Sequence, residues 1–211
     1  MEYNIQNYKQ ELIYWAKRLY EKGMSPACSG NISIKLDKKI LISASGTCLN
    51  DLTQEDIVII DYNGNLLEGN KKPSSEKIMH SEIYTKRDDI NAIIHCHCPL
   101  ITSFAVAGIP MKKPILPDFA LYYDEIPLIP YHCPSSIELA EVVGKTFEKN
   151  SAALLKNHGI VMGADSLKNA FYQLELLRAY TETYFGAEVL GGAKSISKKN
   201  VEEIKRLYRK N

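Results

Sequence analysis

The stretch Ala92-Ile-Ile-His95-Cys-His97-Cys-Pro99 is the most informative segment of the chain. Its apolar first half predicts a buried strand, and two histidines follow at the end of that strand. Side chains at positions i and i+2 of a strand point to the same face, about 6.5–7 Å apart, so His95 and His97 can bind one metal ion together. Cys96 and Cys98 alternate with them and are predicted to face the other way.

A third histidine is expected for such a site, because a catalytic zinc ion usually has three protein ligands and one open position. His158 ends a second strand-like run, Ala152-Ala-Leu-Leu-Lys-Asn-His158, and is the best placed of the remaining histidines. His80 falls in the middle of a predicted helix, and His132 lies in Tyr131-His-Cys-Pro134. The pattern therefore predicts a metal site formed by His95, His97 and His158, and the open position of this site suits catalysis.

The composition excludes several classes of protein. The chain has 211 residues, of which 45% are hydrophobic and 24% charged, as in an ordinary globular protein. We find no change of composition that would mark a domain boundary, so residues 1–211 are predicted to form a single domain. The net charge of +1 argues against nucleic acid as a partner. No apolar run approaches the ~18 residues of a membrane span, and the N-terminus does not resemble a signal peptide.

The number and spacing of the cysteines indicate the cellular compartment. There are five, an odd number, and they form no disulfide-like framework, which is typical of a reducing compartment. A zinc knuckle of cysteines and histidines would need a second closely spaced cysteine pair, which the chain lacks. We therefore expect a cytoplasmic protein.

Hydrophobic periodicity predicts alternating helices and strands, and hence an α/β fold. Helices are expected from Ile5 to Gly23, from Pro73-Ser-Ser-Glu76 to Tyr84, over 100–107, from Ser135 to Lys149, over a long segment containing 167–177, and over the tail 198–211. Strands are expected over 32–34, 40–42, 57–60, 66–67, 92–94, 126–130, 152–155 and 160–162. The turn pair Asn63-Gly64 predicts a hairpin, so the sheet must be at least partly antiparallel.

Two of the expected helices carry recognisable start signals. Ser74 or Ser75 is a natural N-cap for the helix that follows. Ser135-Ser-Ile-Glu138 has the spacing of a capping box.

Three short segments combine glycine with small polar side chains. In Ser29-Gly30-Asn31 and Ser45-Gly46-Thr47, glycine lets backbone N–H groups approach an anion, and the neighbouring side chains add donors. Ser74-Ser75 adds the N–H groups and positive dipole of a helix start. Together these segments suit one phosphate group. Neither a Walker sequence nor a GxGxxG sequence is present, so a nucleotide is not indicated.

Glu76 is a candidate acid or base. It is expected as the second or third residue of its helix, where a carboxylate stabilises the helix dipole by only ~0.3–1 kcal/mol. A carboxylate that lies beside both an anion site and a metal would instead be suited to general acid–base catalysis.

These pieces, in this order, resemble the class II, metal-dependent aldolase family, typified by the fuculose-1-phosphate and rhamnulose-1-phosphate aldolases. The resemblance spans roughly residues 28 to 160 and is carried by Cys-Ser-Gly-Asn-Ile-Ser (28–33), Ile-Ser-Ala-Ser-Gly-Thr (42–47), Pro-Ser-Ser-Glu (73–76), His-Cys-His (95–97) and Lys-Asn-His-Gly (156–159). It implies a three-layer α/β/α fold around a mixed, largely antiparallel sheet. It also implies a cyclic homotetramer with active sites at subunit interfaces.

The same resemblance implies roles for the residues named above. His95, His97 and His158 would hold Zn²⁺ or another divalent ion such as Mn²⁺ or Co²⁺, and Glu76 would be the acid or base. The substrate phosphate would be bound by Gly30, Asn31, Ser45, Gly46, Ser74 and Ser75. The substrate would be a phosphorylated sugar, a ketose 1-phosphate cleaved to dihydroxyacetone phosphate and an aldehyde through a metal-stabilised enediolate.

One feature of the family is missing. Fuculose-phosphate aldolases carry a tyrosine shortly after the histidine strand as proton donor to the departing aldehyde, and the stretch Ile109-Pro-Met-Lys-Lys-Pro114 has none. Tyr122, Tyr123, Tyr131 and Tyr208 are the alternatives.

Other members of the family supply competing functions. A methylthioribulose-1-phosphate dehydratase or a sugar-phosphate epimerase would use much the same site. Pro-Ser-Ser-Glu favours an aldolase, because a lysine after the first serine would suggest the decarboxylases of the family. The non-catalytic alternative is an interaction module like the adducin head, but such a module has no need of three histidines and Glu76.

Overall fold

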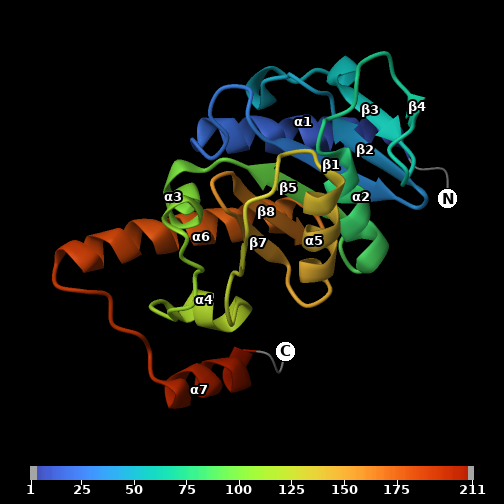
Figure 1. Ribbon diagram of the computed structural model, residues 1–211. Coiled ribbons are helices and arrows are strands. Elements are labelled where there is room, and N and C mark those ends of the chain that lie inside the picture. Colours follow the sequence, from blue (N-terminus) through green and yellow to red (C-terminus); the bar gives the residue numbers. More distant parts are fainter. Residues whose placement is uncertain (1–3, 209–211) are drawn as a thin grey trace.

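The computed structural model describes residues 4–208, which form one eight-stranded sheet with helices on both faces (Figure 1). The strands are β1 (Asn31–Leu36), β2 (Lys39–Ser43), β3 (Ile57–Ile60), β4 (Leu66–Glu68), β5 (Ala92–Cys96), β6 (Leu128–Ile129), β7 (Ala152–Leu155) and β8 (Gly159–Ala164). Their order across the sheet is β4-β3-β2-β1-β5-β8-β7-β6. Every neighbouring pair is antiparallel except β6 and β7, which are parallel. The prediction of a mixed, largely antiparallel sheet is confirmed.

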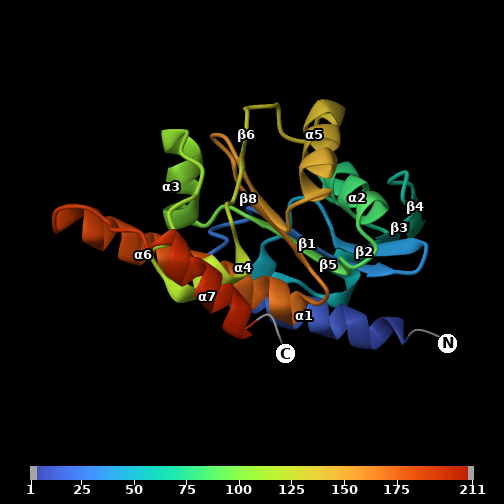
Figure 2. The same cartoon turned by 90° about the horizontal axis from the view of Figure 1, so that it is seen from below.

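Helices cover the two faces and form the outer layers. They are α1 (Ile5–Glu21), α2 (Lys77–Lys86), α3 (Pro99–Ala107), α4 (Pro117–Tyr122), α5 (Ile137–Phe147), α6 (Leu167–Val189) and α7 (Lys198–Tyr208), with short 3-10 helices at Leu49–Asp51 and Gln54–Asp56. Figure 2 shows α2 and α5 on one side of the sheet and α1 and α6 on the other. The side chains between sheet and helices form two separate hydrophobic clusters, one on each face. The three-layer α/β/α prediction is therefore also confirmed.

The pairing of β5 explains why distant segments meet at one place. β5 lies between β1 and β8 and is antiparallel to both, with Asn31 opposite His95 and Cys96 opposite Ile160. The end of β5 therefore meets the beginning of β1 and the turn before β8. Because β2 is antiparallel to β1, the loop that follows β2 lies at the same edge of the sheet.

Most local predictions hold, and the hairpin is the clearest. β3 and β4 are antiparallel, and Gly64 in the turn between them has a positive φ of 80°. The Asp61 carboxylate accepts hydrogen bonds from the backbone N–H groups of Asn63 and Asn65, which stabilises this turn. Cys96 and Cys98 are buried in the cluster on the α1–α6 face, so they do face away from the histidines.

The predicted helix starts are wrong by one or two residues. α2 has Glu76 as its N-cap and begins at Lys77, so neither Ser74 nor Ser75 caps it and Glu76 precedes the helix. α5 is capped by Ser136, whose side chain accepts from the N–H of Leu139, so the predicted capping box does not form. The physical reason is that the chain enters both helices through an extra turn, which shifts the cap.

Two further elements differ from their predictions. The strand expected over 126–130 is reduced to Leu128–Ile129, because only these two residues pair with β7. The short helix α4 was not predicted; it packs against α7, which is the tail helix expected from the sequence (Figure 1). Within residues 4–208 no helix has the length and apolar character needed to cross a membrane.

Candidate active site

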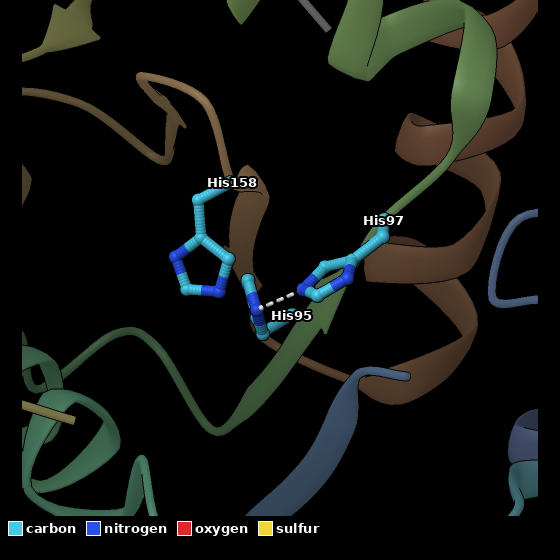
Figure 3. A group of neighbouring side chains, drawn as sticks. All are labelled: His95, His97 and His158. Carbon is cyan, nitrogen blue, oxygen red and sulfur yellow. Dashed lines mark hydrogen bonds between the residues drawn. The ribbon is translucent and has the colours of Figure 1, made fainter. Parts of the chain in front are cut away.

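Three imidazoles converge at the edge of the sheet where β5 ends. His95 is the fourth residue of β5, His97 follows the strand, and His158 lies in the turn between β7 and β8. Figure 3 shows the three rings turned toward one another. Their ring centroids are 4.7 to 5.0 Å apart, and their ligand atoms all lie within 4.8 Å of one another.

The backbone determines how the rings are presented. His95 is fully buried, and its Nδ1 donates to the carbonyl oxygen of Ile160 at 3.0 Å, which directs Nε2 into the cluster. Gly159 allows the close approach of the two histidine segments. A methyl group at this position would lie 2.5 Å from the carbonyl oxygen of Cys96 and 2.8 Å from the His97 ring. A larger residue than glycine would therefore push the segments apart.

The cluster fits a divalent metal ion. Two nitrogens bound to one tetrahedral zinc ion lie roughly 3.4 Å apart, and the Nε2 atoms of His95 and His97 are 3.1 Å apart. Burial, followed by the charge of His95, lowers the pKa of His97 and of His158 to about 4. Both imidazoles are therefore neutral at pH 7 and can donate lone pairs. Nδ1 of His158 and Oε1 of Glu76 are both buried, and neither has a hydrogen-bond partner among the residues that the structure describes.

The carboxylate of Glu76 lies directly beside the histidines. Its Oε2 is 3.0 Å from His95 Nε2, and its Oε1 is 3.6 Å from His158 Nε2. Burial alone would raise the pKa of Glu76, but His95 and then His158 hold it well below its usual value. Burial also opposes protonation of His95, yet the attraction of Glu76 outweighs it and raises the pKa of that imidazole. Glu76 is thus a buried carboxylate that stays ionised.

The three small-residue segments surround one cavity of about 210 Å³ beside this carboxylate. Its walls include Gly30, Asn31, Ser45, Gly46, Ser74, Ser75, Glu76, His97 and His158. Gly30 has a positive φ of 81°, and a side chain there would lie 2.6 Å from the backbone oxygen of His95. The fold thus brings together every site residue predicted from the sequence, with His95 buried next to the cavity.

A larger hollow, of about 490 Å³, lies at the opposite end of β1, among Tyr8, Lys35, Asp37 and Asp165. None of the predicted site residues lines it. The smaller cavity is the better candidate, because buried polar groups converge there.

Asn31 has a position that the sequence did not indicate. Its side chain is only 6% exposed; Nδ2 donates to Glu76 Oε2 at 3.2 Å, and Oδ1 accepts from His80 Nε2 at 2.6 Å. An amide nitrogen has two hydrogens, so one N–H remains for a substrate oxygen. His80, which the sequence places in the middle of a helix and does not favour as a metal ligand, therefore lies directly behind the site. The spacing of four residues from Glu76 to His80 was the available signal.

The tyrosines considered as proton donors lie elsewhere. Tyr123 is buried and hydrogen-bonded to Gln173, and burial raises its pKa. Tyr122, Tyr131 and Tyr208 are exposed by 53%, 59% and 66%. Among the residues that the structure describes, no tyrosine lines the cavity.

Cys28 and Cys48 form a disulfide, which the spacing of the cysteines in the sequence did not predict. They flank two of the cavity loops, one before β1 and one after β2, and the antiparallel pairing of these strands brings them together. The expectation of a chain without disulfides is therefore wrong for this pair, while Cys96, Cys98 and Cys133 are free.

Reducing this bond is expected to lower the free energy of unfolding by about 3 kcal/mol, because it closes a loop of about 20 residues in the unfolded chain. Urea unfolding with and without dithiothreitol measures the change. Cys28→Ser is the control, since the reductant should then have no effect. Equal unfolding midpoints for the native chain in both conditions would contradict the prediction.

The family model for the Class II Aldolase and Adducin N-terminal domain matches residues 10–185. An L-fuculose phosphate aldolase of Methanococcus maripaludis is 36% identical over 79% of this chain and 90% of its own. A 5-deoxy-D-ribulose 1-phosphate aldolase of Bacillus thuringiensis is 29% identical over 97% and 96%. A 3-oxo-tetronate 4-phosphate decarboxylase of Haemophilus influenzae is 30% identical over 84% and 86%.

Among solved structures, an L-fuculose 1-phosphate aldolase superposes with a TM-score of 0.88 at 33% identity. The match covers 95% of each chain.

Proposed function

This chain belongs to the class II aldolase and adducin family, and we propose that it is a metal-dependent aldolase that cleaves a ketose 1-phosphate to dihydroxyacetone phosphate and an aldehyde. Its relatives and structural neighbour include class II aldolases, which are lyases. The observation that carries the proposal is the position of Glu76. Its carboxylate lies 3.0 Å from His95 Nε2 and also lines the cavity formed by the three small-residue loops.

Class II aldolases use a divalent metal, and His95, His97 and His158 are the residues that would hold it here. We propose Zn²⁺, with Mn²⁺ or Co²⁺ as alternatives, because three imidazoles suit these ions. When bound, the ion supplies Lewis-acid stabilisation of the negative charge that develops on the substrate oxygens. His95 contributes a ring already oriented by Ile160.

The phosphate is proposed to bind in the cavity. The donors offered by backbone and hydroxyl groups come from Gly30, Ser45, Gly46, Ser74 and Ser75, and Asn31 offers its second N–H. Among residues 4–208, no lysine or arginine lines the cavity, so recognition by these residues would depend on hydrogen bonds rather than on a side-chain cation. Binding the phosphate away from the breaking bond would position the substrate.

Glu76 is proposed to transfer the proton to and from C3 of the substrate. In cleavage, the hydroxyl at C4 would lose its proton to solvent, the C3–C4 bond would break to give the aldehyde, and its electron pair would remain on C3. Glu76 would take up one proton from solvent and deliver it to C3, which completes dihydroxyacetone phosphate, and in synthesis it would remove that proton again. A carboxylate that remains ionised at rest is ready for the synthetic direction.

We propose a ketose 1-phosphate as the substrate, and the relatives of this chain differ in the sugar phosphate that their names give. Similar proteins carry different names, for L-fuculose phosphate, 5-deoxy-D-ribulose 1-phosphate and a 3-oxo-tetronate 4-phosphate. Pro73-Ser-Ser-Glu76 supports an aldolase over a decarboxylase. The intact histidine cluster and buried Glu76 favour catalysis over an adducin-like interaction role.

A coupled assay of dihydroxyacetone phosphate release tests this function on a panel of ketose 1-phosphates, including L-fuculose 1-phosphate and 5-deoxy-D-ribulose 1-phosphate. We expect release that EDTA abolishes and added Zn²⁺, Mn²⁺ or Co²⁺ restores, since the ligand set suits these ions. No release by metal-loaded protein would refute the aldolase and make methylthioribulose 1-phosphate the next compound. Release that is unaffected by EDTA in protein shown to be metal-free would remove the metal from the mechanism.

The oligomeric state of the protein and its cellular location are also proposed. We propose a homotetramer with active sites at subunit interfaces, in the cytoplasm, formed by a single domain over residues 1–211. Such an interface offers a route by which a tyrosine exposed on one subunit, such as Tyr131, reaches the cavity of another. Light scattering measures the assembly, and free-thiol counts on freshly lysed cells measure whether Cys28 and Cys48 are joined there.

A further inference from the structure

A chain of buried polar side chains extends from Glu76 into the core between β1 and α2. Beyond Asn31, His80 Nδ1 lies 2.7 Å from Ser33 Oγ, and Ser33 Oγ lies 2.7 Å from the hydroxyl of Tyr84. Ser33, His80 and Tyr84 are at most 1% exposed. Asn31 and Ser33 lie two residues apart on β1 and so share its α2 face. Glu76, His80 and Tyr84 follow one another at four-residue intervals along α2 and its cap.

The donors and acceptors of this chain have one consistent arrangement. The Asn31 oxygen can only accept, so His80 must donate through Nε2. A neutral imidazole has a single N–H, so Nδ1 of His80 accepts from the Ser33 hydroxyl. The Tyr84 hydroxyl then donates to Ser33 Oγ at 2.7 Å, and the backbone oxygen of Ser33 is a second acceptor for it at 3.1 Å. Burial, followed by the charge of His95, lowers the pKa of His80 to about 3, which keeps the ring neutral.

This arrangement decides which way the Asn31 amide faces. With His80 in this tautomer, turning the amide over would set its NH₂ group against the N–H of His80 and its oxygen against the Glu76 carboxylate, and both contacts would be repulsive. His80 therefore holds the amide with an N–H on Glu76 Oε2, and that N–H fixes the carboxylate next to the histidine cluster.

This series of hydrogen-bonded side chains is connected to the active site at its Glu76 end and not at its Tyr84 end. At the Tyr84 end every polar group has a partner. At the other end Oε1 of Glu76 is buried, and no atom within the described range 4–208 forms a hydrogen bond with it. Elsewhere α2 packs through apolar side chains such as Met79 and Ile83. Polar groups thus replace apolar packing along the line that leads to the carboxylate.

We propose that His80, supported by Ser33 and Tyr84, is a positioning residue that acts through Asn31 to hold the Glu76 carboxylate in its reactive position. This inference rests on the proposed role of Glu76 as acid or base. His80 belongs neither to the histidine cluster nor to the residues that line the cavity, and it contacts that lining through Asn31, so its effect on turnover would pass through Asn31 and Glu76.

A double-mutant cycle between His80→Leu and Glu76→Gln tests the proposal, with kcat and KM measured on the best ketose 1-phosphate of the panel. His80→Leu removes the donor at similar volume and is expected to lower kcat about 10–100-fold, because a displaced catalytic group loses about that much. Metal content and KM should change less than about threefold. In the Glu76→Gln background His80→Leu should have almost no further effect on kcat.

The conservative variant separates positioning from packing. His80→Gln keeps an N–H near the Nε2 position and is expected to recover most of the lost kcat. If His80→Leu does not fold, Ser33→Ala carries the same cycle, since it removes the hydroxyl that orients His80. Equal losses of kcat in the wild-type and Glu76→Gln backgrounds would overturn the inference and leave the function of Glu76 intact. A near-normal kcat for Glu76→Gln alone would instead overturn the proposed function.

Discussion

Replacing His95 or His158 by alanine is expected to abolish metal binding and to lower turnover at least about 10³-fold, because several kcal/mol of charge stabilisation are lost with the ion. The sheet should survive, since both residues lie at strand ends and the two hydrophobic clusters do not depend on them. Metal content by atomic emission and kcat by the coupled assay measure the effect, with circular dichroism to verify folding.

His132→Ala is the matched control, because His132 lies outside the cluster of the three imidazoles. It should keep both metal and turnover. A folded His95→Ala or His158→Ala protein that is free of metal and fully active would refute the assignment of these histidines.

Glu76→Gln is expected to lower kcat by about 10²–10⁴-fold, the usual contribution of a general acid or base. The amide is nearly the same size as the carboxylate and can still accept a hydrogen bond from Asn31, so metal content and the binding of inorganic phosphate should remain. Phosphate affinity is measured by isothermal titration and turnover by the coupled assay.

Glu138→Gln is the control for this change. Glu138 lies in the first turn of α5 and is exposed, so it shares with Glu76 only its place near a helix start. If the role of Glu76 were to stabilise a helix dipole, both variants would lose a few tenths of a kcal/mol of stability and neither would lose turnover. Such a result would remove Glu76 from the mechanism.

The metal site and the cavity were predictable to different degrees. The pairing of His95 with His97 follows from the two-residue period of a strand, because the spacing of the two histidines can be read directly from the sequence. The small-residue loops were recognisable from glycine and its polar neighbours, but each one alone is an ordinary turn. Their convergence on one cavity depends on the strand order β2-β1-β5-β8, in which partners are separated by up to about seventy residues. Local patterns carry no information about such pairing.

By itself, the amino-acid sequence determined the alternation of helices and strands, the orientation of the histidine pair, and the set of polar groups available for chemistry. These features depend on periodicity and on backbone preferences within a few residues. Only the tertiary structure decided that His80 stands behind Asn31, that Cys28 meets Cys48, and that Glu76 precedes its helix with its carboxylate among the histidines. The physical reason is that burial and antiparallel pairing act between residues far apart in the chain, and these forces place the polar groups of the site.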